Sequence, residues 1–237
     1  MSDASDARSY RHGVRAVVPL AIAVFGFGLS YGVLSRAAGM GDVAPIVMSA
    51  TTFAGSAQFA AASVLGAGGS AATAILAAVM LNARYLPIGV TVAPWLEGNA
   101  WSRLLHAHLT VDESWAVASE GHGRWNPRVL IAAGAGIWVA WVGGTVGGVV
   151  FGNAIGDPNR LGLDAAFPAL FLALLAPQVR DARPGAAPGV RVAGNVPLIA
   201  AVIGAAIALI LTPFTPAGVP IVAAGAACVL GLRRRPA

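Results

Sequence analysis

The chain has 237 residues, of which 57% are hydrophobic and 11% are charged, and its mean hydropathy is +0.74. Soluble domains carry about 25% charged residues, so this composition excludes an ordinary soluble protein and predicts a polytopic membrane protein. The net charge of +5 comes from arginines without any lysine, and these lie mainly in short segments between apolar runs. Because they form no compact basic domain, nucleic-acid binding is not expected.

Seven apolar runs follow one another along the chain, and each is a candidate membrane segment. A helix needs about 20 apolar residues to cross the hydrocarbon core of a bilayer, so we expect an all-α polytopic integral membrane helix bundle with about seven membrane segments. The runs are Val17–Ser35, Val43–Leu65, Ala71–Pro94, Val129–Phe151, Leu163–Pro177, Val196–Leu211 and Ala217–Leu232. We expect a polar N-terminal tail at residues 1–16, a single transmembrane domain at 17–232 and a basic C-terminal tail at 233–237.

Two short linkers predict tight turns, and one long linker predicts an interfacial helix. Gly66–Ser70 joins the second and third runs into an antiparallel hairpin, and Thr212–Pro216 joins the last two. The polar stretch at residues 95–128 has tryptophans and leucines at helical spacing, which is typical of a helix at the membrane surface. Asp112 falls on the apolar side of that helix and needs a partner, for which Arg84 or an arginine near the cytoplasmic end is a candidate.

The arginines give conflicting information about orientation. Those at residues 8–15 favour a cytoplasmic N-terminus by the positive-inside rule. Three later groups, at residues 103–128, 180–191 and 233–235, favour the cytoplasm as well. Seven full spans cannot place every group on one side. Either one early segment does not cross fully, or some arginines lie outside.

A glycine pattern occurs twice. Gly28-x-x-x-Gly32 in the first run is echoed by Gly144-x-x-x-Gly148 in the fourth. An offset of three segments would give an inverted repeat, the common plan of secondary transporters, and the interrupted second and short fifth segments would then correspond. The same spacing also arises from close helix packing alone, and this simpler interpretation is favoured.

The second run is rich in hydroxyl and amide groups. Within MSATTFAGSAQFAAAS, residues 48–63, a glycine separates the hydroxyls from the amide. A helix broken there would expose backbone N–H and C=O groups that can bind an amino acid. Serine and threonine can instead bond to their own helix carbonyls, whereas a buried glutamine needs several partners. The predicted substrate-binding residues of this run are Thr52, Gly55, Ser56, Gln58 and Phe59.

The third run carries Arg84 near its centre, two residues after Asn82. An arginine at the middle of the bilayer costs about 2.5–3.5 kcal/mol even on the lenient insertion scale, so Arg84 is expected to face a partner or a wet cavity. A structural ion pair and a contact with a substrate carboxylate fit this position equally well. Asn82 would cap an unwound turn or join the same pocket, and both residues are predicted to bind substrate. Phe53, Phe59 and Phe167 would support an aliphatic side chain by burying its surface.

Other classes of protein fit less well. An intramembrane serine hydrolase would need a base beside Ser56, but no apolar run contains histidine or lysine. No phosphate-binding P-loop sequence occurs, and His106-x-His108 has no convincing third metal ligand. We therefore expect neither an enzyme nor a cofactor or metal. A channel-like pore, which would also have a polar interior, and a non-transporting scaffold subunit are the alternatives to a transporter.

Four sequence blocks occur in a definite order. They are MSATTFAGSAQF at 48–59, NARY at 82–85, LTVDESWA at 109–116 and DAAFPALFLALL at 164–175. Together they resemble the AzlC-type branched-chain amino acid permease family, from about Val17 to Pro177. The resemblance implies a multi-pass protein of the bacterial plasma membrane. It would export branched-chain or other small hydrophobic amino acids as the large subunit of a two-component exporter, with a small AzlD-type membrane subunit as partner.

Two positions depart from the pattern of that family. The family usually has a histidine after the arginine of its Asn-x-Arg motif, where this chain has Tyr85. The acidic motif is usually Leu-Thr-Asp-Glu, which Val111 interrupts here. The candidates for coupling or gating are Asp112, Glu113 and Asp164.

Overall fold

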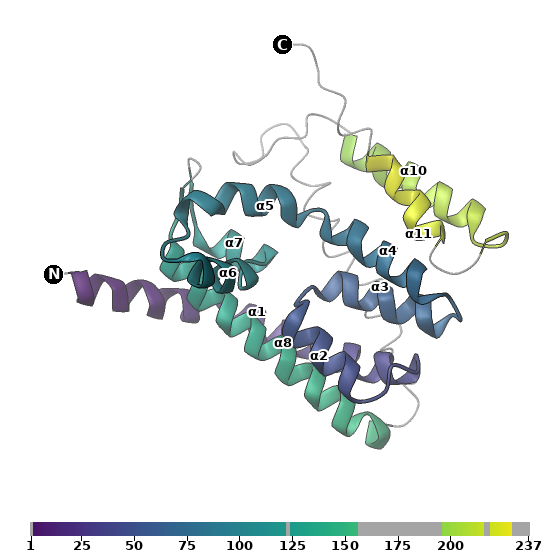
Figure 1. The fold of residues 1–237 in the computed structure, drawn as a ribbon, viewed down its shortest axis with the longest axis horizontal. Helices are drawn as coiled ribbons and strands as arrows, with labels where there is room; N and C mark the ends of the chain where they lie inside the picture. Colours follow the sequence, from purple (N-terminus) through teal and green to yellow (C-terminus); the bar gives the residue numbers. More distant parts are fainter. Residues whose placement is uncertain (1, 122–123, 156–195, 216–218, 229–237) are drawn as a thin grey trace, which may run out of the picture.

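The computed structural model describes residues 2–121, 124–155, 196–215 and 219–228 (Figure 1). These residues are mostly helical, as the sequence predicts. The β structure among them is one small antiparallel hairpin, β1 (Ser119–Gly121) and β2 (Arg124–Trp125).

Two long helices form the scaffold of the molecule. They are α1 (Ser2–Ala37) and α8 (Pro127–Ile155). Both are long and apolar enough to cross a membrane, over Ser9–Ala37 and Pro127–Gly152. Because α1 begins at Ser2, the helix extends back through the segment that the sequence predicts as a polar tail.

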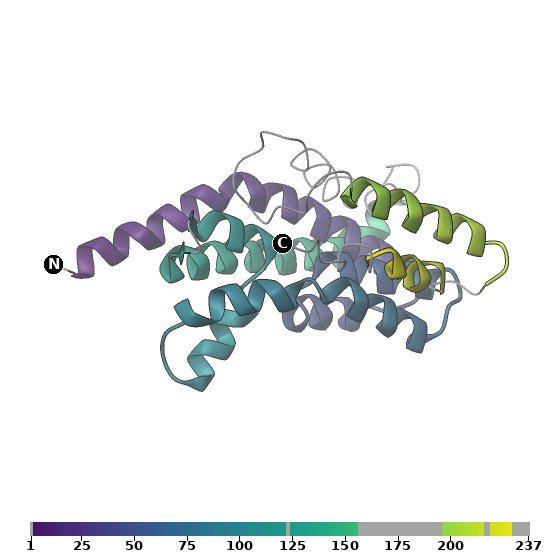
Figure 2. The ribbon, with the colours of Figure 1, turned by 90° about the horizontal axis from the view of Figure 1, so that it is seen from above.

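Glycines bring α1 and α8 into backbone contact. Gly28 lies against Gly144, and Gly32 lies against Gly148 four residues further along both helices, so the two helices run parallel. A Cβ atom on Gly28 would lie 2.7 Å from the carbonyl oxygen of Trp141, which leaves no room for any side chain. Figures 1 and 2 show the two helices side by side. The two glycine motifs are therefore the two sides of one helix interface.

This contact accounts for the echo between the first and fourth runs without an inverted repeat. Small residues allow close approach of membrane helices, and both motifs are needed for a single contact. The fifth predicted segment, Leu163–Pro177, would have to correspond to the second run in a repeat. It lies outside the described residues. An inverted repeat would also give α1 and α8 opposite directions, whereas they run parallel, so the repeat is not confirmed.

The second run is broken into two helices. These are α2 (Val43–Thr51) and α3 (Gly55–Gly66), with the break at Thr52–Ala54. At the centre of the break Phe53 has a φ of 45°. Such a conformation is rare for a bulky residue and requires support from the surrounding structure. The expected interruption at Gly55 is thus found immediately before that residue, which opens α3.

The two halves of this run return to the end from which they started. Asp42, just before α2, forms an ion pair of 2.6 Å with Arg36 in the last turn of α1. Gly66, the last residue of α3, lies against Ala38, just after α1. The candidate segment Val43–Leu65 is therefore a re-entrant helical hairpin and not one continuous span, in keeping with the interruption expected in this run. The reason is the break, because a bend at mid-run lets α3 pack back along α1.

The third run is bent at the arginine. It forms α4 (Ala71–Asn82), α5 (Tyr85–Val92) and a 3-10 turn, η1 (Ala93–Trp95). The bend between the two parts is 42°, and together they are long enough for one span. The turn predicted at Gly66–Ser70 is confirmed. Gly68 there has a φ of 77°, and α4 packs back against α3.

The polar stretch also forms a hairpin, so the prediction of a single interfacial helix is wrong. The chain forms α6 (Ala100–His108), turns, and continues as α7 (Asp112–Ala118). At the turn the Ser114 hydroxyl accepts the Val111 N–H at 2.9 Å and so stops α6 from continuing into α7. The tip of this hairpin meets the tip of α2–α3, because the Nε2–H of His108 donates to the carbonyl of Ala50 at 3.1 Å. Two helical hairpins from opposite ends thus meet halfway along α8.

The last described helices are short. They are α10 (Val196–Leu211), α11 (Val219–Ala224) and the 3-10 turn η4 (Gly225–Cys228). α11 packs on α4, and α10 packs on α11. Among the described residues, two helices are long enough to span a membrane, or three if α4–α5 is one bent span. The seven predicted spans are therefore not confirmed.

Because α1 and α8 are parallel, the arginines that precede their apolar parts lie at the same end of the molecule. We call this the basic end and define it by Arg11, Arg15, Arg124 and Arg128. The re-entrant α2–α3 hairpin makes this arrangement compatible with the chain path, because α1 leads away from the basic end and α4–α5 leads back. Two explanations of the arginine positions were considered from the sequence. The described residues support the first, in which one early segment does not cross the membrane fully.

Candidate functional site

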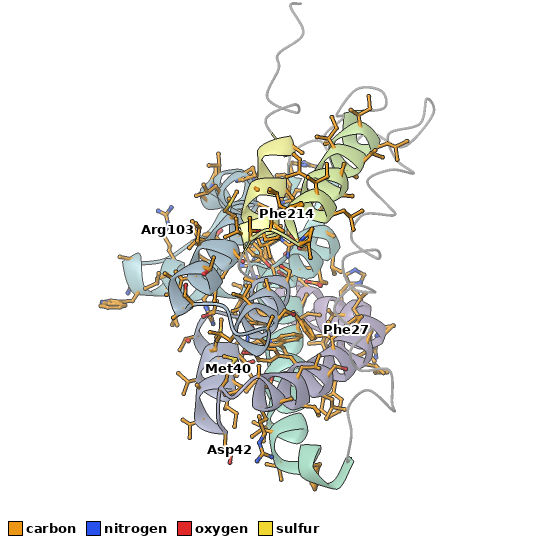
Figure 3. All side chains as sticks on the ribbon, turned by 90° about the vertical axis from the view of Figure 1, so that its right-hand side faces the viewer. Phe27, Met40, Asp42, Arg103 and Phe214 are labelled. Atoms are coloured by element: carbon orange, nitrogen blue, oxygen red, sulfur yellow. The ribbon has the colours of Figure 1, made fainter. Side chains whose placement is uncertain are left out.

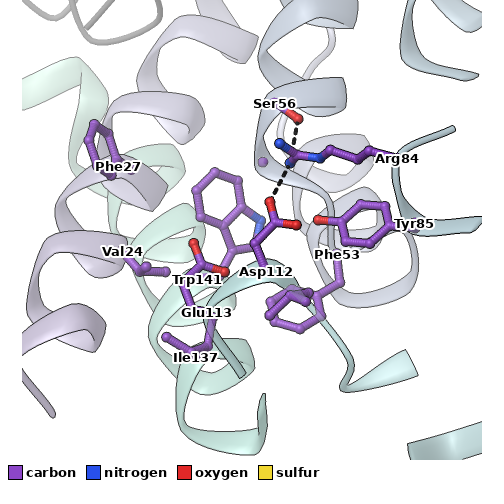
Figure 4. A pocket seen from close by; sticks show the side chains of 12 residues that line it. Val24, Phe27, Phe53, Ser56, Arg84, Tyr85, Asp112, Glu113, Ile137 and Trp141 are labelled. Atoms are coloured by element: carbon purple, nitrogen blue, oxygen red, sulfur yellow. Dashed lines mark hydrogen bonds and ion pairs between the residues drawn. The ribbon is translucent and has the colours of Figure 1, made fainter. Parts of the chain in front are cut away.

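A cavity of about 60 Å³ lies where the two hairpin tips meet the bend of the third span (Figure 4). The first residues of α3, α5 and α7 all face it, although these helices are far apart in sequence. Its polar lining consists of Gly55, Ser56, Arg84, Tyr85, Asp112 and Glu113. Its apolar lining consists of Val24, Phe27, Phe53, Val111, Ile137 and Trp141.

Arg84 is the centre of the polar side. It lies at the bend between α4 and α5, and its Nη2 donates to Asp112 Oδ2 at 3.0 Å and to Ser56 Oγ at 3.1 Å. The predicted partnership of Asp112 with Arg84 is therefore confirmed. The Nε of Arg84 is buried without a hydrogen-bond partner, so the guanidinium still has an unused donor. The ion pair joins the third span to the α6–α7 hairpin.

The two acids of the cavity differ in how they are held. Asp112 is paired with Arg84, yet burial outweighs that attraction and raises the pKa of its carboxyl. Burial also raises the pKa of Glu113. A hydrogen bond to the residue's own backbone lowers this pKa, but by less than burial raises it. Both residues open α7, which is not a membrane-spanning helix. A cation or a proton in this cavity would therefore interact with two carboxyls that resist ionisation.

Gln58 lies behind the wall of the cavity in a closed ring of hydrogen bonds. Its Nε2 donates to Ser49 Oγ at 2.9 Å, which lies 2.8 Å from Thr145 Oγ1. Thr145 donates to the carbonyl of Trp141, and the indole N–H of Trp141 donates back to Gln58 Oε1 at 3.0 Å. That oxygen also accepts the N–H of Ala54 in the break. Gln58 is fully buried and does not line the cavity, so its contacts hold the break and Trp141 in place.

The broken end of α2 is satisfied by two side chains from other elements. The helix break leaves the carbonyl of Ala50 without an intrahelical donor. The carbonyl oxygen of Ala50 instead accepts two hydrogen bonds, one from the indole N–H of Trp138 at 3.1 Å and one from the His108 ring. Phe53 then packs against the His108 ring at 5.8 Å between centroids. These contacts supply the support that the unusual backbone of Phe53 requires.

The other predicted polar residues are placed as follows. Thr52 is exposed within the break and does not line the cavity. Asn82 ends α4, and its side-chain oxygen is buried without a hydrogen-bond partner. Asp164 lies outside the described residues. Of the predicted set, Gly55, Ser56, Arg84, Asp112 and Glu113 are brought together around one cavity.

The apolar wall differs in part from the prediction. Phe53 lines the cavity, whereas Phe59 is buried behind it against Trp141, and Phe167 lies outside the described residues. Trp141 and Tyr85 also line the cavity, although neither was predicted to do so from the sequence. Trp141 lies in an apolar run that also serves for helix packing, so its sequence carries no signal. Tyr85 could have been found from its position beside the central arginine.

This set of groups suits a small zwitterion with an apolar side chain. A guanidinium matches a carboxylate at two points, and carboxyls match an ammonium. The first-turn amides of α3 have no intrahelical acceptor and favour an anion at that end. The cavity nevertheless has room for only a few water molecules, since one water needs about 10–15 Å³. A larger molecule therefore requires the Arg84–Asp112 pair to separate.

The sequence profile of the family described as "AzlC protein" matches residues 19–155 of this chain. A Bacillus subtilis protein named "Branched-chain amino acid transport protein AzlC" is 30% identical over 175 residues, which cover 69% of this chain and 67% of that protein. An Archaeoglobus fulgidus protein named "Uncharacterized membrane protein" is 29% identical over 186 residues, covering 76% and 80% respectively. No solved structure matches the chain significantly.

Proposed function

This chain belongs to the AzlC family, and we propose that it is a permease that exports branched-chain amino acids across the bacterial plasma membrane. The observation that carries the proposal is the Arg84–Asp112 pair, which lies on the polar side of a cavity with an apolar wall, at the bend of a candidate membrane helix. An arginine at such a position costs several kcal/mol. A purely structural pair would not need an adjoining cavity with a second acid and an aromatic wall.

In this proposal the amino acid replaces contacts that the protein makes with itself. The substrate carboxylate binds Arg84 and so releases Asp112, which then pairs with the substrate ammonium. Ser56 and the amide of Gly55 add hydrogen bonds to the carboxylate. The branched side chain rests on Phe53 and the other apolar lining residues. Each exchange replaces one charge pair by another, so no charge is left unpaired in the cavity.

The remaining predicted residues have supporting roles in the same proposal. Thr52, Gln58 and Phe59 set the position and shape of the break, and Asn82 does the same at the bend of the third span. Asp112, Glu113 and Asp164 carry coupling or gating. Glu113 is the first candidate for a coupling proton, because a buried carboxyl with a raised pKa can change its protonation state when an ammonium arrives.

Direction and assembly complete the proposal. The positive-inside rule favours the basic end as cytoplasmic, which would let the cavity load from the cytoplasm. Export would then require release at the opposite end. As the large subunit of a two-component exporter, the chain would act with a small AzlD-type membrane subunit, as the family resemblance implies.

The test is efflux of labelled leucine from preloaded bacterial cells. We expect efflux in cells that express this chain together with a small AzlD-type membrane subunit, and little efflux with either alone. Collapse of leucine export against a gradient by a protonophore would support a transporter over a channel-like pore. No difference from empty cells for leucine, isoleucine, valine and methionine would overturn the proposed function.

A further inference from the structure

A second hollow lies outside the inner cavity, as an open groove between α5 and α6. One wall carries Ile88, Gly89 and Val92, and the other carries Arg103, Leu104 and Ala107. Glycine and alanine on facing walls leave the groove wide at its middle.

The groove and the inner cavity share one residue. Tyr85 lines both, while the consecutive residues Thr110 and Val111 line one each. The Tyr85 ring lies beside the Arg84 guanidinium, with 5.2 Å between the ring centroid and Cζ. The Tyr85 ring and the tip of the α6–α7 hairpin therefore lie between the groove and the inner cavity.

The groove leads from the basic end of the molecule toward its middle. Val92, near the end of α5, packs with Trp125 and Val129 at the start of α8. The Nη2 of Arg103 donates to the carbonyl of Ala93 at 3.3 Å, which ties α6 to α5 at that same end. Figure 3 shows the head of Arg103 projecting from the surface. The inner end of the groove is the hairpin tip.

We propose that this groove is the route by which the amino acid reaches the inner cavity from the basic end, and that the Tyr85 ring is its gate. The inference rests on the proposed function for the identity of the molecule that passes. Arg103 at the mouth attracts the carboxylate end of a zwitterion, and the apolar walls accept its side chain. Rotation of the Tyr85 ring toward the groove would open the cavity beside Arg84, where the carboxylate exchanges with Asp112.

The route can be tested by cysteine labelling of the full chain with its small membrane protein. Cys228, the one cysteine of the sequence, is first replaced by serine. Gly89→Cys then places a thiol in the groove, where a Cβ meets nothing within 4 Å. Val90→Cys is the matched control, because Val90 is the next residue of α5, is 75% exposed and does not line the groove. The probes are a sulfonate-bearing methanethiosulfonate and N-ethylmaleimide.

The expected result depends on sidedness and on the polarity of the probe. In inside-out vesicles the charged probe should modify Gly89→Cys at least about tenfold faster than Val90→Cys, because thiolate reaction needs water. Modification of Gly89→Cys should block leucine transport. In right-side-out vesicles the same thiol should be protected from the charged probe. If only N-ethylmaleimide reacts at both positions, the groove is filled by lipid and the proposal is overturned. Equal reaction from both sides also overturns it.

A second labelling experiment tests whether Tyr85 is the gate. Ser56→Cys puts a thiol in the inner cavity, and its labelling rate by the charged probe reports how often the cavity opens to the groove. Tyr85→Ala should raise that rate several-fold, whereas Tyr85→Phe, which keeps the ring, should leave it unchanged. An unchanged rate in Tyr85→Ala rejects Tyr85 as the gate.

The two proposals can fail separately. If the unaltered chain transports none of leucine, isoleucine, valine and methionine, the proposed function fails, while the labelling rates at Gly89→Cys and Ser56→Cys still report whether the groove leads to the cavity. If leucine is transported but the charged probe does not reach Gly89→Cys from the basic end, the route is wrong and the proposed function stands.

Discussion

α1 and α8 each continue as one unbroken helix, α1 with Pro19 inside it, and glycines let the two backbones touch. Around the cavity three helices are interrupted, and side chains must satisfy the backbone groups that each break leaves free. The first arrangement supplies apolar side chains to the cavity, from Val24 and Phe27 on α1 and from Ile137 and Trp141 on α8. The second places a guanidinium, two carboxyls and helix N-termini at one point, supported by the rigid pair. Irregular backbone at membrane depth is tolerated where it is buried in protein or lines a cavity.

The largest effect is expected where the two backbones touch. Gly28→Leu must separate α1 from α8, because the obstacle is the carbonyl of Trp141 and not a side chain that can rotate away. The loss of folding stability should be larger than that of ordinary overpacking, which is about 1–3 kcal/mol. We expect almost no folded protein by size-exclusion chromatography in detergent. Gly26→Leu is the control, because a Cβ there meets nothing within 4 Å. Equal recovery of both variants would show that the glycine contact is not needed.

The ring of hydrogen bonds behind the cavity should give the next largest effect. Gln58→Leu removes one hydrogen bond from each of three groups, the Ala54 N–H, the Ser49 hydroxyl and the Trp141 indole N–H. Each buried group left unsatisfied costs about 1–3 kcal/mol, so the variant should fold but melt at a clearly lower temperature. Thr51→Val is the control, because Thr51 is exposed and bonds only to its own helix carbonyl at Val47. An unchanged melting temperature for Gln58→Leu would instead favour direct contact with substrate.

Arg84 should affect transport more than stability. Arg84→Lys keeps the charge beside Asp112 but loses the flat two-point contact with a carboxylate. We expect a stably inserted protein with leucine efflux reduced about tenfold or more, which corresponds to about 1.4 kcal/mol of lost binding. Arg36→Lys is the matched control, because its partner Asp42 is exposed and lies away from the cavity. Normal efflux by Arg84→Lys would reject the carboxylate clamp.

The smallest effect is a change in the pH dependence of stability. Since burial raises the pKa of Glu113 above its ordinary value of 4.5, the folded protein holds this proton more tightly than the unfolded chain. Stability is therefore lost as the pH rises from that ordinary value through the folded pKa. Glu113→Gln removes this loss, whereas the loss from Asp112, which has the same sign, remains. Melting temperatures of both proteins between about pH 4 and pH 8 should converge at low pH. Parallel curves would contradict the prediction.

Much of the site could be predicted from the sequence because polar groups in apolar runs are costly wherever they lie. Arg84 and its partner Asp112 were identified in this way, and so were Gly55 and Ser56 at a break. The contribution of Gln58 was predicted only in part. Its need for several partners is visible in the sequence, but three of these partners are the protein's own groups on α2, in the break and on α8. Local sequence gives no information about such distant contacts.

The sequence by itself determined that this is a helical membrane protein with a charged interior, because hydropathy and the cost of a buried charge are properties of each segment alone. Only the tertiary structure decided where each segment bends and which segments pack together. An apolar run such as Val43–Leu65 is long enough for a span, and turns back because the backbone of Phe53 is held by Ala50, Gln58 and their partners from other helices. The pairing of the two glycine motifs was likewise decided by packing, since identical spacing fits a repeat or a contact until the two helices are seen together.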